Sequence, residues 1–281
     1  MHRTRLRGRV AVVTGASSGI GAATVRQMAD QGMHVVLAAR SREPLEREVS
    51  LLESRGARCL AVLTDVSYRE SVQRLLDATI EHFGRVDVWV NNAGSGLVAA
   101  FEQTTDAEME FIWRVNYMGA FHGCAAVLPQ MRRQGSGHIL NVSSLAGRFP
   151  LPLNAAYCAS KAAMTALSHA LRFELAGSGI YVTAVLPSLT ETPFAQNAIR
   201  KIEGRDIAGR LVRADPPERV ARAILSAIRR PRPEVVCLPW PRLVLAVTDL
   251  APSVWHAVAR AYLRLRTGGR TSEETVSGRR G

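Results

Sequence analysis

Residues 10–21 of this 281-residue chain read VAVVTGASSGIG, a short apolar run followed by a glycine-rich turn. The run predicts a buried strand, and a helical pattern over 19–31 places the glycines at a strand-to-helix turn. Glycines there let the backbone approach a phosphate closely, and the helix begins with unpaired N–H donors at its positive end. The stretch therefore predicts a nucleotide-binding βα unit.

Short apolar runs and longer helical patterns alternate beyond this stretch. The apolar runs predict six strands, at 10–14, 33–39, 57–63, 86–90, 138–144 and 181–186. The helical patterns lie at 19–31, 42–55, 68–83, 105–133 and 154–176. Strands this apolar are typical of parallel strands buried on both faces. The order predicts an α/β fold, with a Rossmann-type doubly wound parallel sheet of about seven strands in a single domain.

The composition excludes several classes of protein. A chain that is 47% hydrophobic and 21% charged is not intrinsically disordered. Its net charge of +12 suggests a nucleic-acid partner, but residues 10–228 hold 22 basic and 20 acidic side chains. The excess therefore lies at the two ends, and we expect no nucleic-acid partner. Arginine supplies every base except Lys161 and Lys201, a bias that a GC-rich genome produces.

The cysteines and histidines form no metal-binding pattern. The four cysteines, Cys59, Cys124, Cys158 and Cys237, include no CxxC pair, and no HExxH occurs. We therefore expect no metal, and free thiols in a reducing compartment, the cytoplasm. No apolar stretch approaches the roughly 20 residues of an ordinary spanning helix. The run AVV near the N-terminus is too short for a signal-peptide core.

Further motifs follow the glycine-rich turn in order. Residues 91–94 read NNAG after the strand at 86–90, Asn116 lies in the next helical pattern, and residues 157–161 read YCASK. A pair of serines, Ser143 and Ser144, ends the strand at 138–144.

Together with the GxxxGxG spacing of residues 15–21, this series resembles the short-chain dehydrogenase/reductase family over roughly residues 8–230. Ser144 lies 13 residues before Tyr157, an interval that fits the family pattern better than that of Ser143. The resemblance implies a catalytic set of Asn116, Ser144, Tyr157 and Lys161.

The spacing of Tyr157 and Lys161 suits proton transfer. Residues four apart share one helix face, and a lysine ammonium favours tyrosinate, so we expect Lys161 to lower the pKa of the Tyr157 phenol. The resemblance also implies that Lys161 binds ribose hydroxyls, that Ser144 holds the substrate oxygen, and that Asn116 anchors a water relaying protons to Lys161.

The end of the strand at 33–39 indicates which nicotinamide cofactor is used. An acid at this position pairs with the ribose of NAD, whereas a base accommodates the 2′-phosphate of NADP. Here Arg40 follows the strand and no acid is present, which favours NADP(H) over NAD(H). From the glycine-rich turn, Arg40 and the family resemblance, the residues expected at the cofactor are Gly15, Ser17, Ser18, Gly19, Ile20, Gly21, Arg40, Asp65, Val66, Asn92, Ala93, Gly94, Tyr157, Lys161, Pro187, Thr190 and Thr192. Ser188 replaces the glycine usual in the family after Pro187, which puts one backbone contact in doubt.

Three loops are expected around the substrate by the same resemblance, at 94–101, 145–154 and about 188–215. Their apolar residues are Leu97, Val98, Phe101, Leu145, Phe149, Leu151, Leu153, Leu189 and Phe194. They suggest a pocket for a hydrophobic carbonyl or alcohol, although several can instead pack on the core or on a partner subunit. The charges and glycines of residues 195–215 are typical of a mobile lid.

The chain divides into a catalytic domain, 1–238, and a C-terminal extension, 239–281. The family resemblance implies a seventh strand in PRPEVVCLP. Residues 253–266 predict an amphipathic helix before a disordered tail. That helix can lie on an anionic membrane as a peripheral contact, dock on the core, cover the substrate site or join subunits.

The sequence therefore predicts an NADP(H)-dependent oxidoreductase that interconverts a carbonyl and an alcohol on a small molecule. The alternative is a noncatalytic dinucleotide-binding regulator on the same fold. The resemblance implies a homodimer or homotetramer, joined through the helices at 105–133 and 154–176.

Overall fold

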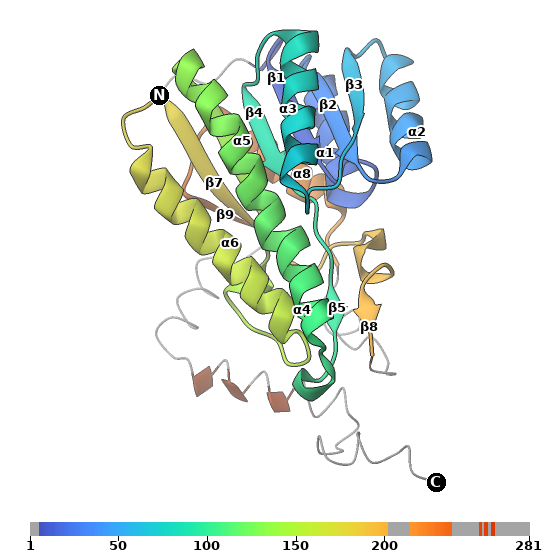
Figure 1. Cartoon of the computed structure of the whole chain (residues 1–281), viewed down its shortest axis with the longest axis vertical. Coiled ribbons are helices and arrows are strands. Elements are labelled where there is room, and N and C mark those ends of the chain that lie inside the picture. Colours follow the sequence, from blue (N-terminus) through green and yellow to red (C-terminus); the bar gives the residue numbers. More distant parts are fainter. Residues whose placement is uncertain (1–5, 202–213, 238–252, 255, 258–259, 262–281) are drawn as a thin grey trace.

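A computed structural model describes residues 6–201 and 214–237, together with 253–254, 256–257 and 260–261. Its main feature is a seven-stranded parallel sheet in the order β3-β2-β1-β4-β6-β7-β9 (Figure 1). The strands are β1 Val10–Thr14, β2 His34–Ala39, β3 Cys59–Leu63, β4 Val88–Asn91, β6 Gly137–Val142, β7 Ile180–Pro187 and β9 Glu234–Cys237. The helices are α1 Gly19–Asp30, α2 Arg42–Glu53, α3 Arg69–Phe83, α4 Asp106–Trp113, α5 Gly119–Gln134, α6 Ala155–Glu174 and α8 Pro217–Arg229.

Helices cover both faces of the sheet. Successive strand residues point to opposite sides, and because both sets are apolar, each face is buried against helices. Ala11 and Val13 of β1 belong to a core that includes α1, α2 and α8. Val10 and Val12 belong to a second core, with α3, α5 and α6. Figure 1 shows α5 and α6 side by side on this second face. The strands are therefore buried on both faces, and the prediction of a single-domain, seven-stranded Rossmann-type sheet is confirmed.

The helical pattern at 105–133 is not one continuous helix. α4 ends at Trp113, a π-helical turn, η2, covers Arg114–Met118, and α5 begins at Gly119. A π turn inserts an extra residue into the helical ladder and often accompanies a functional site. Asn116, predicted as catalytic, lies in this turn.

A second sheet consists of two short parallel strands, β5 Leu97–Val98 and β8 Ile199–Arg200. They lie at the lower end of the molecule in Figure 1, beyond the carboxyl ends of the main sheet. Within the 195–215 stretch predicted as a mobile lid, residues 199–200 pair with β5, and the mobility of the stretch stays a prediction. Residues 202–213 of that stretch lie outside the described residues.

Most of the predicted C-terminal extension also lies outside the described residues. Within 253–266, the six described positions are helical, and Val254 is exposed. In the described part of the chain, no helix has the length and apolar character needed to cross a bilayer. Membrane contact through the extension stays a prediction.

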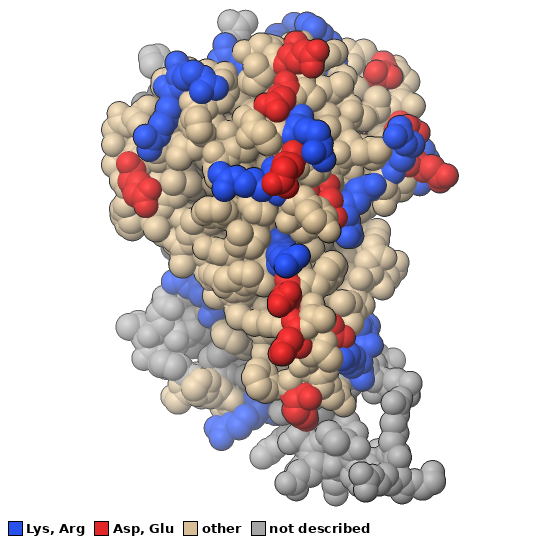
Figure 2. Space-filling view, viewed as in Figure 1, with Lys and Arg blue, Asp and Glu red and all other residues tan. Residues whose placement is uncertain are grey.

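Charges of both signs are interspersed over the face of the body seen in Figure 2. Apolar side chains that are more than a third exposed also occur on the helices at 105–133 and 154–176, and they are Met109, Trp113, Phe121 and Phe173. These helices are the ones predicted to join subunits, and that interface stays a prediction.

A buried histidine makes the fold sensitive to acid. The Nε2 of His138 lies 2.8 Å from Thr183 Oγ1, whose hydroxyl donates to the Arg232 carbonyl oxygen. His138 Nε2 must therefore donate, which leaves Nδ1 without a proton. That nitrogen is buried and has no partner among the described residues. Burial, with a smaller effect of Arg172, lowers the pKa of His138 from 6.5 to about 3.

We predict that replacing His138 with glutamine makes the fold less sensitive to acid. Between pH 6.5 and about 3 the unfolded histidine binds a proton that the folded one does not, so stability is lost as pH falls through this window. The free energy of unfolding of the wild type should fall more steeply from pH 7 to pH 4 than that of the variant, in urea titrations followed by circular dichroism. Parallel pH profiles would contradict the prediction.

Candidate active site

The glycine-rich turn packs so closely that its glycine positions leave no room for a side chain. Gly15 and Gly19 have φ of +65° and +54°, the left-handed region that favours glycine. A Cβ on Gly21 would lie 2.1 Å from the Gly15 carbonyl oxygen. One on Gly19 would lie 2.9 Å from the Thr192 methyl group. The spacing therefore brings bare backbone to the surface at the start of α1.

The start of α1 has features that favour binding of an anion. Ser18 occupies the N-cap position, but its side chain makes no capping hydrogen bond, and the first turn holds no acid. The first N–H groups of a helix lack intrahelical partners and carry partial positive charge. A pyrophosphate fits this end of the helix because it supplies both acceptors and negative charge.

Residues 91–94 brace the turn from the neighbouring strand. The N–H groups of Asn92 and Ala93 donate to Thr14 Oγ1, at 3.0 and 3.1 Å. The Asn92 side chain donates to the Thr14 carbonyl oxygen at 2.8 Å. This motif therefore fixes the shape of the glycine-rich turn. Its last residue, Gly94, lies beside the side chains of Asn116 and Lys161.

A buried amide network that no sequence pattern predicted lies below the site. Asn91 and Asn141 are paired across β4 and β6, and Asn91 Nδ2 donates to Asn141 Oδ1 at 2.8 Å. Asn141 Nδ2 donates to Ser168 Oγ of α6 at 2.9 Å. Because both amides are buried, their paired hydrogen bonds fix the position of α6 on the sheet.

Tyr157 and Ser144 meet at the carboxyl end of β6. The Tyr157 hydroxyl forms a side-chain hydrogen bond with Ser144, whose Oγ also accepts from the Ala146 N–H at 3.1 Å. Ser143 points elsewhere, because its Oγ lies 2.8 Å from both the Lys161 carbonyl oxygen and Thr165 Oγ1. Of the two serines, only Ser144 therefore faces the phenol.

Lys161 is buried one helical turn beyond Tyr157. Its ammonium Nζ donates to the Val142 carbonyl oxygen at 2.9 Å and lies 5.9 Å from the centre of the Tyr157 ring. A Cβ on Gly94 would lie 3.5 Å from this Nζ. A side chain at Gly94 would therefore contact the buried ammonium, so the glycine leaves room beside it.

Asn116 joins three parts of the site. Its Oδ1 accepts from the Ser95 N–H at 2.8 Å. Its Nδ2 donates to the Ser95 carbonyl oxygen and to Ser160 Oγ, both at 3.0 Å. Ser160 Oγ in turn donates to the Tyr157 carbonyl oxygen at 2.8 Å. The side chain thus ties the loop after β4 to α6, and its predicted role with a water stays a prediction.

Burial is the largest cause of the pKa shifts of both Tyr157 and Lys161. It raises the pKa of Tyr157 to about 12, and the hydrogen bond with Ser144 offsets only part of this rise. Burial also lowers the pKa of Lys161 to about 8. The pKa of Tyr157 in the free protein is therefore shifted upward overall, opposite to the lowering expected from Lys161. A phenol with this pKa is fully protonated at neutral pH, as a proton donor must be.

The predicted cofactor residues beyond the turn lie at the same edge of the sheet. Arg40 follows β2, is exposed and forms no ion pair with another described residue. Asp65 follows β3, and its Oδ1 accepts from the Ser67 hydroxyl at 2.6 Å. Val66 is buried against Gly119.

The segment after β7 completes that edge. Pro187 is the last residue of β7, and Thr190 pairs with Asp215. Ser188, which replaces the usual glycine, donates to Asp215 Oδ2 at 2.8 Å. Its φ is not positive, so the serine adds no backbone strain. Thr192 reaches back to Gly19.

The predicted substrate residues have different surroundings. Phe194 faces the site, with its ring 5.8 Å from that of Tyr157. Leu97 is instead buried in a small cluster with Ile112 and Ala156, and Phe101 is 81% exposed. Packing on the core, the alternative that the sequence left open, therefore holds for Leu97.

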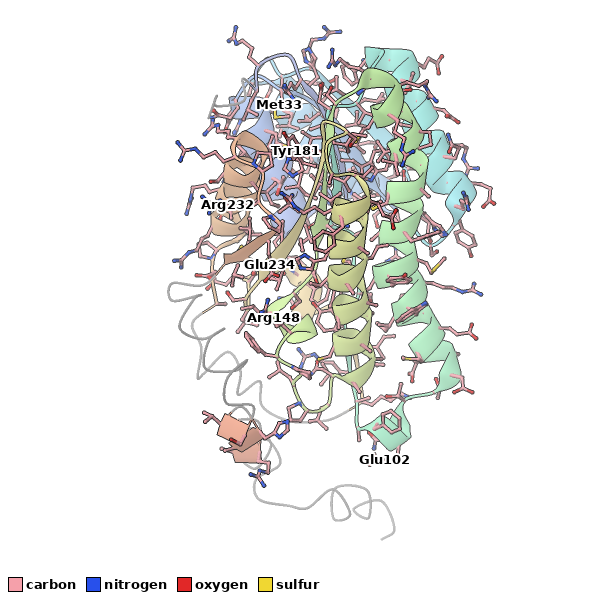
Figure 3. All side chains as sticks on the ribbon, turned by 90° about the vertical axis from the view of Figure 1, so that its left-hand side faces the viewer. Met33, Glu102, Arg148, Tyr181, Arg232 and Glu234 are labelled. Carbon is pink, nitrogen blue, oxygen red and sulfur yellow. The ribbon has the colours of Figure 1, made fainter. Side chains whose placement is uncertain are left out.

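The loop after Ser144 is attached to the sheet. Arg148 follows the short helix η3, Leu145–Gly147, and its ion pair with Glu234 of β9 measures 3.0 Å. Figure 3 shows the two residues on the same side of the molecule. His169 of α6 lies 3.2 Å from the same carboxylate.

Together, the braced glycine-rich turn and the Ser144–Tyr157–Lys161 cluster define a dinucleotide-dependent oxidoreductase. The described residues hold no cluster of side chains able to bind a metal ion. Residues 9–203 match the family model described as short chain dehydrogenase. The chain belongs to the short-chain dehydrogenase/reductase family.

The sequence and the fold of the chain are similar to those of known short-chain dehydrogenases/reductases and other dehydrogenases or reductases. The chain is 38% identical to 3beta-hydroxysteroid dehydrogenase 1 of Eggerthella lenta over 209 residues, 74% of this chain and 80% of that protein. A short-chain dehydrogenase/reductase from Burkholderia phymatum in complex with NAD has a TM-score of 0.81 and 29% identity, covering 89% and 96% of the two chains. An actinorhodin polyketide ketoreductase variant with NADPH has a TM-score of 0.75 and 30% identity, covering 82% and 95%.

The site fits a nicotinamide dinucleotide. Gly15, Gly19 and Gly21 allow the turn to pack closely against its own backbone, Asn92 and Thr192, and the uncapped start of α1 suits the pyrophosphate. The contact of Lys161 with ribose hydroxyls stays a prediction. The bound nicotinamide would supply the hydride chemistry, while the protein supplies the proton and the orientation.

Proposed function

We propose that this chain is an NADP(H)-dependent oxidoreductase that interconverts a carbonyl and an alcohol on a hydrophobic small molecule. The observation that carries the proposal is the cluster of Ser144, Tyr157 and Lys161 beside the glycine-rich turn. In the direction of reduction, Ser144 Oγ holds the substrate oxygen and the Tyr157 hydroxyl donates a proton to it. The Lys161 ammonium favours the resulting tyrosinate, and Asn116 keeps the surrounding loop in place.

The preference for a hydrophobic substrate rests on Phe194 at the ring of Tyr157. The chain's similarity to a steroid dehydrogenase and to a polyketide ketoreductase supports the same class. The test is a screen of NADPH oxidation with ketones, aldehydes, quinones, steroids and acyl thioesters. Turnover of a hydrophobic carbonyl compound supports the proposal, and no turnover of any class contradicts it.

The preference for NADP(H) rests on Arg40. Its guanidinium is exposed and unpaired among the described residues, at the end of β2 where the adenosine ribose would lie. It can therefore form charge-assisted bonds with a 2′-phosphate. The nearby Arg42 already pairs with Glu46 of its own helix, at 3.2 Å.

We predict that Arg40→Asp weakens NADPH binding roughly 100-fold, because a charged hydrogen bond is replaced by repulsion, while NADH binding changes by less than about threefold. Fluorescence titration of both cofactors measures the two dissociation constants. Arg42→Asp is the matched control, with a much smaller expected effect. Equal affinity of the wild type for NADPH and NADH would contradict the assignment.

A further inference from the structure

The segment from Thr192 to Lys201 lies along the site. At its start, the Thr192 methyl group packs against Gly19 of the glycine-rich turn. Two residues later, the Phe194 ring lies beside Tyr157 and close to Gly94 and Gly96. The segment therefore runs from the glycine-rich turn to the Tyr157 ring.

The far end of this segment is fixed at β8. Ile199 N–H donates to the Gly96 carbonyl oxygen and Lys201 N–H to that of Val98, both at 3.0 Å. The Ile199 side chain packs on the cluster that contains Ala156, the neighbour of Tyr157. The near end is held separately, through the contacts of Ser188 and Thr190 with Asp215.

Lys201 holds the far end of the Thr192–Lys201 segment through an ion pair and a hydrogen bond. Its Nζ lies 2.7 Å from Glu108 Oε2 and donates to the Gln103 carbonyl oxygen at 2.7 Å. Glu108 belongs to α4, where the same Oε2 accepts from the N–H and hydroxyl of Thr105 in a capping box. The bond from Lys201 is the largest cause of the lowered pKa of Glu108. The pair is only partly exposed, at 30% and 19%.

We propose that Lys201 is a positioning residue that latches the Thr192–Lys201 segment onto α4 and so holds Phe194 beside Tyr157. Release of the latch frees the Phe194 ring to move away from Tyr157 and weakens the fit of a bulky substrate. The catalytic part of this inference rests on the proposed function, whereas the latch itself does not.

Two variants on one helix test the latch. Glu108→Gln removes the negative charge that Lys201 contacts but keeps an acceptor for Thr105, because glutamine also completes a capping box. Glu110→Gln is the matched control. Glu110 lies two residues further along α4 and pairs with Arg114, at 3.9 Å, rather than with the segment.

The chain contains only two lysines, so a lysine-specific endoprotease has two sites. Lys161 is 3% exposed inside α6, and cleavage after it therefore reports opening of the whole fold. Cleavage after Lys201 reports release of the segment. We expect Glu108→Gln to accelerate cleavage after Lys201 about fivefold and Glu110→Gln less than twofold, since a partly exposed ion pair has a modest effect.

Mass spectrometry of the fragments separates these outcomes. Faster cleavage after Lys201 alone, in Glu108→Gln alone, supports the latch. Equal rates in Glu108→Gln and Glu110→Gln overturn it, as does an equal acceleration at Lys161, which would indicate general loss of stability. None of these results depends on enzymatic turnover, so a failed activity screen would not alter their meaning.

Steady-state kinetics with a bulky ketone test the consequence for the substrate. Lys201→Met should raise KM about fivefold while kcat changes less than about twofold, because substrate fit is lost and the proton donor is intact. Lys201→Arg keeps the charge and should retain a KM near that of the wild type. Adding Glu108→Gln to Lys201→Met should have no further effect. An unchanged KM in Lys201→Met overturns the positioning role.

Discussion

Replacing Tyr157 with phenylalanine should reduce turnover at least about 1000-fold while leaving NADPH affinity within about threefold of the wild type. The change removes one oxygen atom, the proton donor that Ser144 contacts. It keeps the aromatic ring that packs beside Phe194. Single-turnover oxidation of NADPH by a carbonyl substrate measures the first quantity, and fluorescence titration measures the second.

The matched control is Tyr181→Phe. Tyr181 lies on β7, is 46% exposed, and makes an edge-on contact with His138, with the ring centroids 6.0 Å apart, rather than facing the site. This variant should retain turnover within about twofold, since surface substitutions away from a site have small effects. Full activity of Tyr157→Phe would show that the proton comes from another group.

Gly21→Ala should abolish NADPH binding and destabilise the fold. The added Cβ would lie 2.1 Å from the Gly15 carbonyl oxygen and 2.7 Å from Asn92 Nδ2. Neither neighbour can yield alone, because Asn92 also holds the Thr14 carbonyl oxygen. We expect a loss of about 3 kcal/mol in the free energy of unfolding and at least about 100-fold in NADPH affinity.

Gly56→Ala separates this steric effect from backbone strain. Gly56 has a φ of +75°, and a Cβ added there would meet no heavy atom within 4 Å. Alanine there should cost about 1 kcal/mol of stability, and NADPH affinity should be unchanged. Urea unfolding and NADPH titration of both variants provide the comparison. A Gly21→Ala protein that binds NADPH like the wild type would contradict the predicted role of the turn.

The sheet could be predicted because each strand is a nearly continuous apolar run. The first strand has the predicted bounds, Val10–Thr14, and the choice of Ser144 over Ser143 agrees with the contact to Tyr157. These features depend on residues that are close in sequence or separated by regular elements. The strand bounds and the choice of serine can therefore be predicted from the local residue pattern and the order of the strands.

Other features depend on contacts between distant segments that have no periodicity. The latch joins Lys201 to Gln103, 98 residues apart, and strand β8 has two residues. The one available signal was that Lys201 is a rare lysine in an arginine-rich chain. The pKa of Tyr157 was predicted in the wrong direction because burial depends on packing, which the i+4 spacing does not reveal.

The strand order has a consequence for synthesis of the chain on the ribosome. β1 pairs with β2 on one side, but its other partner, β4, begins 78 positions after the first residue of β1. A nascent chain that has emerged only as far as β3 therefore exposes a row of unpaired backbone groups along β1, an edge prone to aggregation. Arrival of residues 88–91 covers that edge and, through Asn92, also gives the glycine-rich turn its final shape. The step that protects the growing protein from other chains is thus the one that begins to assemble its cofactor site.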